Sequence, residues 1–219
     1  MKTAVLIPTR GDRPGFIAQA KQMLQYQTLR PDKVYIVDAP GQEGVYDTDA
    51  RTRVGIAKAI KDGIDRLFTW DDDEYYAPTY LEWLNSKWTD SDAIGVRNLP
   101  YYHLGHRRAV YREFSAHATN SCTAFVPEAV KDMDVQQTGY MFDTLLWGWL
   151  NAYCSVELVR QPPVPFQVIG MKHGVGAMTA GAHEWPAAMY ELQDTDAHWL
   201  KANIHPAALD FYLEDWKNG

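Results

Sequence analysis

The chain has 219 residues and a formal net charge of −7, and 46% of its residues are hydrophobic. This composition fits one globular domain with a sizeable core, and it argues against a protein that coats nucleic acid over its whole surface. No stretch reaches the roughly 18 apolar residues of a membrane span, and the first residues lack a signal-peptide pattern, so we expect a cytoplasmic protein. The two cysteines, Cys122 and Cys154, are too few for a zinc site or a disulfide framework.

Strands and helices alternate along the first part of the chain. Residues 4–7 form a continuous apolar run that predicts a buried strand, a helix follows from Pro14, and residues 33–37 predict a second strand. This order predicts a right-handed parallel unit, which binds ligands outside the carboxyl ends of its strands. Three polar residues fall at that edge: Thr9, Arg13 and Asp38.

A third unit begins with a helix from residue 50 to about residue 62, which Thr48 or Asp49 can cap. Arg51 and Arg53 lie in its first turn, where the helix dipole disfavours cations. These arginines therefore either form salt bridges with neighbouring acids or bind an anionic ligand.

The strand at residues 66–70 ends in four consecutive acids, residues 71–74. Because side chains at positions i and i+2 of a strand share one side, Asp71 and Asp73 can converge while Asp72 faces away. Two carboxylates at the end of a strand suit Mg²⁺ or Mn²⁺, which complete their coordination with water and substrate phosphate. The pattern indicates a metal-bridged diphosphate, and its alternative is a solvated acidic turn.

A strand at residues 92–97 leads into a segment with four arginines, two histidines and three tyrosines, and no acid before Glu113. Its members are Arg97, Tyr101, Tyr102, His103, His106, Arg107, Arg108, Tyr111 and Arg112. Arginines interleaved with aromatic residues are typical of a nucleic-acid groove. The alternative is an exposed loop whose arginines pair with acids elsewhere.

The second half of the chain adds two candidate polar residues. Asp143 opens a predicted helix and, on structural grounds alone, is an ordinary helix cap. His173 follows a predicted strand and lies between glycines, with His183 as its rival, although a lone histidine is more often structural. Residues 184–216 predict two amphipathic helices joined at residues 203–206.

The ordered set Val5-Leu6-Ile7-Pro8-Thr9-Arg10, Val37-Asp38 and Asp71-Asp72-Asp73 resembles the nucleotide-sugar half of a GT-A glycosyltransferase, most similar to family 2, over about residues 1–95. The resemblance implies an α/β fold with a mostly parallel, Rossmann-like sheet flanked by helices, and a C-terminal helical extension. It implies one domain, in which residues 1–97 bind the nucleotide sugar, residues 98–183 hold the acceptor and residues 184–219 form C-terminal helices.

The same resemblance assigns roles to residues. It places the nucleotide sugar at Pro8, Thr9, Arg13, Asp38, Arg53, Asp71 and Asp72. It places Mn²⁺ or Mg²⁺ at Asp71, Asp73 and His173. Asp143 matches the catalytic base of the family's Glu-Asp pair, whose glutamate is replaced here by Phe142. The acceptor-binding residues would be Tyr101, Tyr102, Arg107, Arg108, Arg112 and Ser121.

These parts imply a metal-dependent, inverting transfer of a sugar from a nucleotide sugar, a UDP-sugar foremost, to an acceptor hydroxyl. The Gln-x-x-Arg-Trp signature of processive members is absent. The compact chain with its basic segment looks like the phage enzymes that glycosylate hydroxymethylpyrimidines in DNA. Two alternatives stay open: a transferase for cell-surface polysaccharide, lipid or protein, and a nucleotidyltransferase or inactive nucleotide-sugar-binding module.

Overall fold

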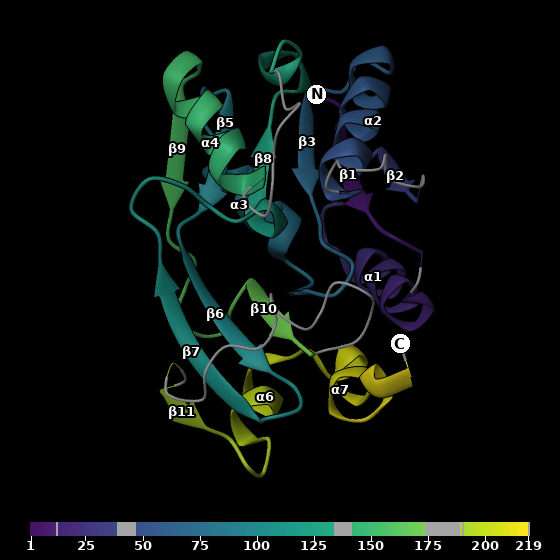
Figure 1. Cartoon of the computed structure of the whole chain (residues 1–219), viewed down its shortest axis with the longest axis vertical. Helices are drawn as coiled ribbons and strands as arrows, with labels where there is room; N and C mark the ends of the chain where they lie inside the picture. The colour runs from purple at the N-terminus through teal and green to yellow at the C-terminus, as the bar shows by residue number, and fades with distance from the viewer. Residues whose placement is uncertain (12, 39–46, 134–141, 174–188, 190, 219) are drawn as a thin grey trace.

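The computed structural model describes residues 1–11, 13–38, 47–133, 142–173, 189 and 191–218 (Figure 1). Its larger sheet has six strands in the order β2 (Lys33–Val37), β1 (Thr3–Pro8), β3 (Arg66–Thr69), β8 (Thr123–Phe125), β5 (Ala93–Val96) and β9 (Val156–Val159). β1 is parallel to β2 and β3, and β5 is parallel to β9, whereas β8 runs antiparallel to both of its neighbours. All six residues of β1 are buried, so this strand is the centre of the core.

Helices flank this sheet: α1 (Pro14–Tyr26), α2 (Asp47–Lys61), α3 (Tyr80–Lys87) and α4 (Phe142–Tyr153). α2 packs directly on β1, and a Cβ atom at Gly55 would collide with the side chain of Leu6. Glycine at this position therefore lets the helix approach the strand closely. Short 3₁₀ turns occur at η1 (Asn120–Cys122), η2 (Pro127–Val130) and η4 (Asp215–Asn218).

A second sheet lies beyond the carboxyl ends of β1 and β3, in the lower half of Figure 1. Its strands are β11 (Leu192–Gln193), β7 (Arg108–Glu113), β6 (Asn98–His103), β10 (Val168–Lys172) and β4 (Tyr75–Tyr76). Two helices, α6 (His198–Asn203) and α7 (Pro206–Leu213), lie next to it. Because β3 belongs to the first sheet and β4 to the second, the acids at residues 71–74 lie where the two sheets meet.

The predicted α/β architecture with helices on the sheet and at the C-terminal end is confirmed, and two local predictions are wrong. The basic segment is not an exposed loop, because residues 98–113 pair as the antiparallel hairpin β6–β7, and its use as a nucleic-acid groove stays a prediction. Residues 192–193 form a strand on β7 rather than part of a helix. The division into 1–97, 98–183 and 184–219 remains a prediction.

Within the described ranges, no helix has both the length and the apolar character needed to cross a bilayer.

Candidate active site

The four acids after β3 are drawn into the protein rather than displayed to solvent. Asp72, Asp73 and Glu74 are buried and Asp71 is half-buried. The prediction that Asp72 faces away is wrong, because β3 ends at Thr69 and the strand alternation no longer applies to these residues. Buried carboxylates need hydrogen bonds or opposite charges, and both are supplied by distant parts of the chain.

The loop between β1 and α1 supplies the first partners. Arg13 Nη2 lies 2.5 Å from Asp72 Oδ1, and Arg13 Nη1 lies 2.5 Å from Asp73 Oδ2. Thr9 Oγ1 donates a hydrogen bond of 2.7 Å to Asp72 Oδ2. Arg13 directly precedes α1, whose first residue, Pro14, fixes the start of the helix. Two residues predicted to bind the nucleotide sugar are thus brought to the acid cluster.

His173 reaches the same acids from the end of β10, 100 residues away in sequence. Its Nε2 atom lies 3.0 Å from Asp73 Oδ2 and 3.5 Å from Arg13 Nη1. Its ring stacks on Phe16 of α1 at 4.3 Å, and Phe211 of α7 packs edge-on against Phe16. The structure therefore assembles Arg13, Asp73 and His173 around one carboxylate oxygen. His183 lies outside the described residues.

Asp71 is oriented by residues that the sequence analysis did not single out. Asn120 Nδ2 donates a hydrogen bond of 2.9 Å to Asp71 Oδ1, and the Asp71 backbone N–H donates to the Tyr76 hydroxyl. That hydroxyl in turn donates to the backbone carbonyl of Ser121, 2.9 Å away. Burial, reinforced by the charge of Asp73, raises the pKa of Asp71 to about 7. Asn120 stands next to Ser121, a predicted acceptor residue, and this neighbour was the only sequence signal for it.

Glu74, the fourth acid of the run, was also missed. Its Oε2 atom accepts the backbone N–H of Met171, and its Oε1 atom lies 3.9 Å from Lys172 Nζ. Burial raises the pKa of Glu74 to about 8, although the Lys172 charge opposes that shift. The Tyr212 hydroxyl of α7 donates to the Glu74 carbonyl, so the C-terminal helices hold the acid loop in place.

Asp73 and His173 offer a carboxylate oxygen and an imidazole nitrogen, both donors that Mn²⁺ accepts. Among the described residues, no three His, Cys, Asp or Glu side chains form a complete metal site. Mg²⁺ and similar ions usually take one or two protein carboxylates and fill the other positions with phosphate and water. The side chains of Asp73 and His173 therefore suit a divalent cation that binds together with a diphosphate. The role of Asp71 as a third ligand stays a prediction.

Asp143 lies in the first turn of α4 and is half-buried. Its Oδ1 atom accepts the backbone N–H of Thr144 at 2.8 Å. Burial raises the pKa of the Tyr101 phenol well above its usual value, and the negative charges of Glu74, Cys122, Asp143 and Asp71 add to the effect. The structure shows no direct contact between Asp143 and the acid cluster among the described residues, and its role as catalytic base stays a prediction.

The predicted acceptor residues divide between the two faces of the second sheet. Residues paired directly across strands share a face, and the pairs Tyr101–Val110, His103–Arg108 and Leu99–Arg112 set the register of the hairpin. By the same rule Lys172, opposite His103 in β10, shares this face. The face is thus lined by Tyr101, Arg108, Arg112 and Lys172.

Tyr102 points the other way. It is buried, stacks on Trp199 at 5.4 Å and donates a hydrogen bond to Asp194. Arg107, at the exposed turn of the hairpin, adopts φ +49° and donates to the carbonyl of Thr195. The acceptor roles of these residues, as of Ser121, stay predictions.

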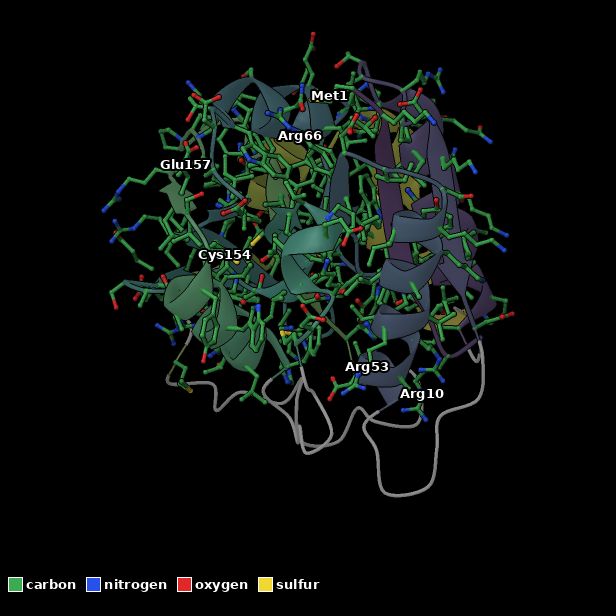
Figure 2. The ribbon with its side chains drawn as sticks, turned by 90° about the horizontal axis from the view of Figure 1, so that it is seen from above. Met1, Arg10, Arg53, Arg66, Cys154 and Glu157 are labelled. Carbon is green, nitrogen blue, oxygen red and sulfur yellow. The ribbon has the colours of Figure 1, made fainter. Side chains whose placement is uncertain are left out.

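The remaining predicted donor residues lie at the carboxyl edge of the larger sheet. Pro8 is paired with Val37, and Asp38 follows directly and is exposed. Arg53 is half-buried on α2. Figure 2 shows Arg53 and Arg10 on the side of the molecule away from Met1. This arrangement agrees with a ligand edge formed by the ends of β1 and β2.

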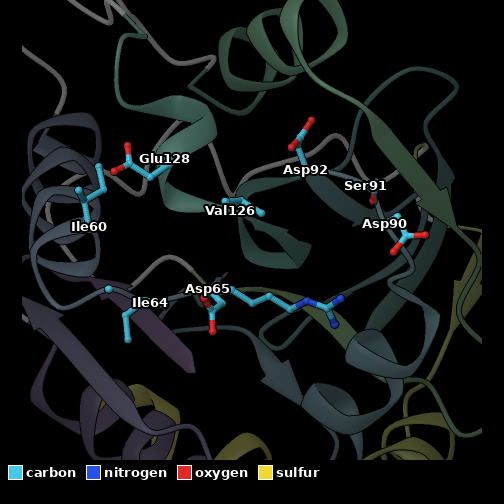
Figure 3. A pocket seen from close by; sticks show the side chains of 10 residues that line it. Ile60, Ile64, Asp65, Asp90, Ser91, Asp92, Val126 and Glu128 are labelled. Atoms are coloured by element: carbon cyan, nitrogen blue, oxygen red, sulfur yellow. The ribbon is translucent and has the colours of Figure 1, made fainter. Parts of the chain in front are cut away.

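A groove of about 490 Å³ opens at the opposite end of the sheet, near the starts of β3 and β5. Figure 3 shows four acids around it: Asp65, Asp90, Asp92 and Glu128. Several of these carboxylates are already used within the chain, since Asp65 accepts the Lys2 N–H and Asp92 accepts the Ser155 N–H. The groove lacks the converging acids and histidine found at the other edge, so the candidate site is the acid cluster.

No model of a known protein family matches the sequence, and no curated protein matches it. Among solved structures, the chain is similar to TarS 1–349 of S. aureus in complex with UDP-GlcNAc, with a TM-score of 0.57 and 13% identity, covering 100% of this chain and 72% of that one. A second TarS 1–349 structure gives a TM-score of 0.53 at 12% identity, covering 78% of this chain but only 60% of the TarS fragment. At this identity the likeness concerns the fold, and it confirms the predicted GT-A architecture.

Proposed function

We propose that the chain is a metal-dependent glycosyltransferase that moves a sugar from a nucleotide-sugar donor to an acceptor hydroxyl. The observation that carries the proposal is the convergence of Arg13, Asp73 and His173 at the junction of the two sheets. The GT-A fold is shared with a protein crystallised with UDP-GlcNAc, which supports a UDP-sugar as the first donor to test.

In this proposal the edge of β1 and β2 receives the nucleotide, with Pro8, Thr9, Asp38 and Arg53 beside the base and ribose. Asp73 and His173, with Asp71, hold Mn²⁺ or Mg²⁺. When bound, the cation neutralises the charge that develops on the leaving diphosphate, a contribution of several kcal/mol.

Asp143 is the proposed general base. It takes the proton from the acceptor hydroxyl while the oxygen attacks the anomeric carbon from the side opposite the diphosphate, and such direct displacement inverts the configuration. The place of Asp143 in the first turn of α4, with a half-buried carboxylate, supports this choice.

For the acceptor we propose a polyanion, namely DNA that carries 5-hydroxymethylpyrimidines. Arg108 and Arg112, which are half-buried on the same face of the β6–β7 hairpin, support this choice, because they offer cations for phosphates. A base hydroxyl would reach the site from the groove or after base flipping.

The test is nucleoside mass spectrometry after incubation with Mn²⁺, a panel of nucleotide sugars, and DNA with or without hydroxymethylcytosine or hydroxymethyluracil. We expect a sugar-sized mass gain on the modified base only. Asp143→Asn should bind the donor normally while its turnover falls about 10²- to 10⁴-fold, the usual contribution of a general base. Asp73→Asn should lose metal-dependent donor binding.

The matched control is Asp90→Asn, which removes an exposed acid from the groove at the opposite edge. Wild-type turnover in Asp143→Asn would remove Asp143 from the mechanism. Metal-dependent donor binding without any DNA product would keep the donor proposal, remove these DNA acceptors, and direct the search to glycan and lipid hydroxyls. Donor binding equal in Asp73→Asn and wild type would contradict the metal site.

A further inference from the structure

Arg13 lies between two buried carboxylates, where the proposed reaction would require a divalent metal ion. Its guanidinium joins Asp72 and Asp73, two buried carboxylates, through separate nitrogen atoms, each 2.5 Å from an oxygen. Its side chain is only 14% exposed, and its guanidinium carbon lies 5.7 Å from the centre of the Phe16 ring. Hydrogen bonds between a guanidinium and a carboxylate are among the stronger hydrogen bonds in proteins, and Arg13 makes one to each of two carboxylates.

Arg13 and a divalent cation compete for the same oxygen. Asp73 Oδ2 is bonded by Arg13 Nη1 and lies 3.0 Å from His173 Nε2. A metal bonded to both Asp73 and His173 at its usual distances would lie within about 4 Å of that guanidinium nitrogen. Two positive charges this close repel each other. The guanidinium of Arg13 therefore has to leave Asp73 when a divalent metal binds there.

The donor offers Arg13 another partner. A guanidinium pairs with phosphate as well as with carboxylate, and Arg13 directly precedes the first turn of α1, a 13-residue helix whose N-terminal end favours anions. Two phosphates placed beside the acids would therefore receive both the metal and the arginine.

We propose that Arg13 is a resident counter-ion that neutralises Asp72 and Asp73 in the free protein, leaves Asp73 when the divalent cation enters, and then pairs with the diphosphate of the donor. The inference rests on the proposed function, and it predicts how the binding of the metal depends on the binding of the nucleotide. Metal alone binds weakly, because it must displace Arg13 without compensation. Metal and nucleotide bind cooperatively, because the nucleotide supplies the new partner.

The test measures Mn²⁺ binding through the electron paramagnetic resonance signal of free Mn²⁺, with and without UDP. In the wild-type protein we expect UDP to raise the affinity for Mn²⁺ at least about tenfold, or about 1.4 kcal/mol. Arg13→Gln should bind Mn²⁺ alone at least about tenfold more tightly than wild type and should lose most of the gain from UDP. Arg13→Lys, which keeps the charge but not the fork, should fall between them.

Arg160→Gln is the matched control, because Arg160 is an exposed arginine that pairs with Glu113 away from the acid cluster. It should bind Mn²⁺ and UDP as the wild type does. Arg13→Gln leaves buried Asp72 without its cation, so thermal unfolding with and without Mn²⁺ is recorded as well. We expect Mn²⁺ to raise the Tm of Arg13→Gln more than that of the wild type, and if Arg13→Gln does not fold, Arg13→Lys carries the same comparison.

The two proposals fail in different ways. If the wild type binds Mn²⁺ and UDP together but the Arg13 variants bind Mn²⁺ alone no more tightly than wild type, the counter-ion role is wrong and the donor site stands. If the wild type binds neither Mn²⁺ nor UDP in any combination, both proposals are wrong.

Discussion

Asp49 is a buried carboxyl group whose surroundings favour the neutral form. It lies on α2 at 1% exposure, and within the described part of the chain neither of its oxygens has a hydrogen-bond partner. Burial raises its pKa from 3.8 to about 7, against the opposing charge of Arg53. Above pH 3.8 the unfolded chain releases this proton while the folded protein keeps it, so this group lowers stability as the pH rises from about 4 to about 7.

Asp49→Asn should therefore change the pH dependence of stability. At pH 4 the variant should match the wild type, and at pH 7.5 it should be more stable by about 1–3 kcal/mol, since the buried group no longer ionises. Thermal unfolding across this range checks the prediction, with exposed Asp90→Asn as the control. A variant that is less stable than wild type at pH 7.5 would show that Asp49 has a charged partner.

Single residues also mark the limit of what the sequence predicts. Arg13, Asp73 and His173 were predicted as site residues, and the structure brings these three side chains together. The inward position of Asp72 was not predicted, because it depends on Arg13 and Thr9, about 60 residues away. Asn120 and Glu74 were missed because nothing local distinguishes a polar residue that will be buried against an acid.

At the scale of elements, β10 and β6 are held together by an unusually close contact. Gly170 of β10 pairs with Tyr101 of β6, and a Cβ atom at Gly170 would collide with the Tyr101 ring. By contrast, Gly148 is exposed in α4, and beyond its own helix backbone and chain neighbours no atom of the described residues lies within 4 Å of its added Cβ position.

These two glycines make a matched pair for substitution. Gly170→Ala should lower the free energy of unfolding by about 1–3 kcal/mol, since overpacking forces the ring or the strands apart. Gly148→Ala should raise it by about 0.5–1 kcal/mol, because alanine has the higher helix propensity. Urea unfolding measures both changes, and a Gly170→Ala protein as stable as the wild type would mean that Tyr101 moves freely.

The elements that were predicted well are those with a strong local signal. The continuous apolar run of β1 and the proline that starts α1 depend little on tertiary context. The hairpin β6–β7 was missed because its arginines and tyrosines obscure the alternation of buried residues, which include Leu99, Tyr101 and Val110. Its outer strand, β11, pairs Leu192 with Ala109 and Gln193 with Arg108, residues 83 and 85 positions apart, and no short-range sequence pattern predicts such a pairing.

At the scale of the whole molecule, the C-terminal helices serve the site as well as the core. The Tyr212 hydroxyl of α7 donates to the Glu74 carbonyl at 2.9 Å, and the Tyr75 hydroxyl accepts the backbone N–H of His205. Both contacts lie next to the acid loop. These C-terminal contacts, called the C-terminal clamp below, therefore hold β4 and the acids that precede it in position.

Tyr212→Phe tests the C-terminal clamp, because it removes the hydroxyl that donates to the Glu74 carbonyl. The variant leaves a buried carbonyl without its donor, so we expect the free energy of unfolding to fall by about 1–3 kcal/mol and the affinity for Mn²⁺ with UDP to fall severalfold. Calorimetric titration and thermal unfolding measure the two effects. Tyr153→Phe is the control, because Tyr153 is 72% exposed. A loss of stability without any loss of affinity would limit α7 to a packing role.

The sequence distance between the parts of the site has a consequence for biosynthesis. Asp73 meets a histidine 100 positions later, and the Glu74 carbonyl is bonded by a tyrosine 138 positions later. While the chain is still on the ribosome, β1, α1, β2, α2 and β3 have already emerged and can fold locally. The acids they deliver remain without their late partners until α7 leaves the exit tunnel, so translation itself delays the moment at which the protein becomes able to bind its ligand.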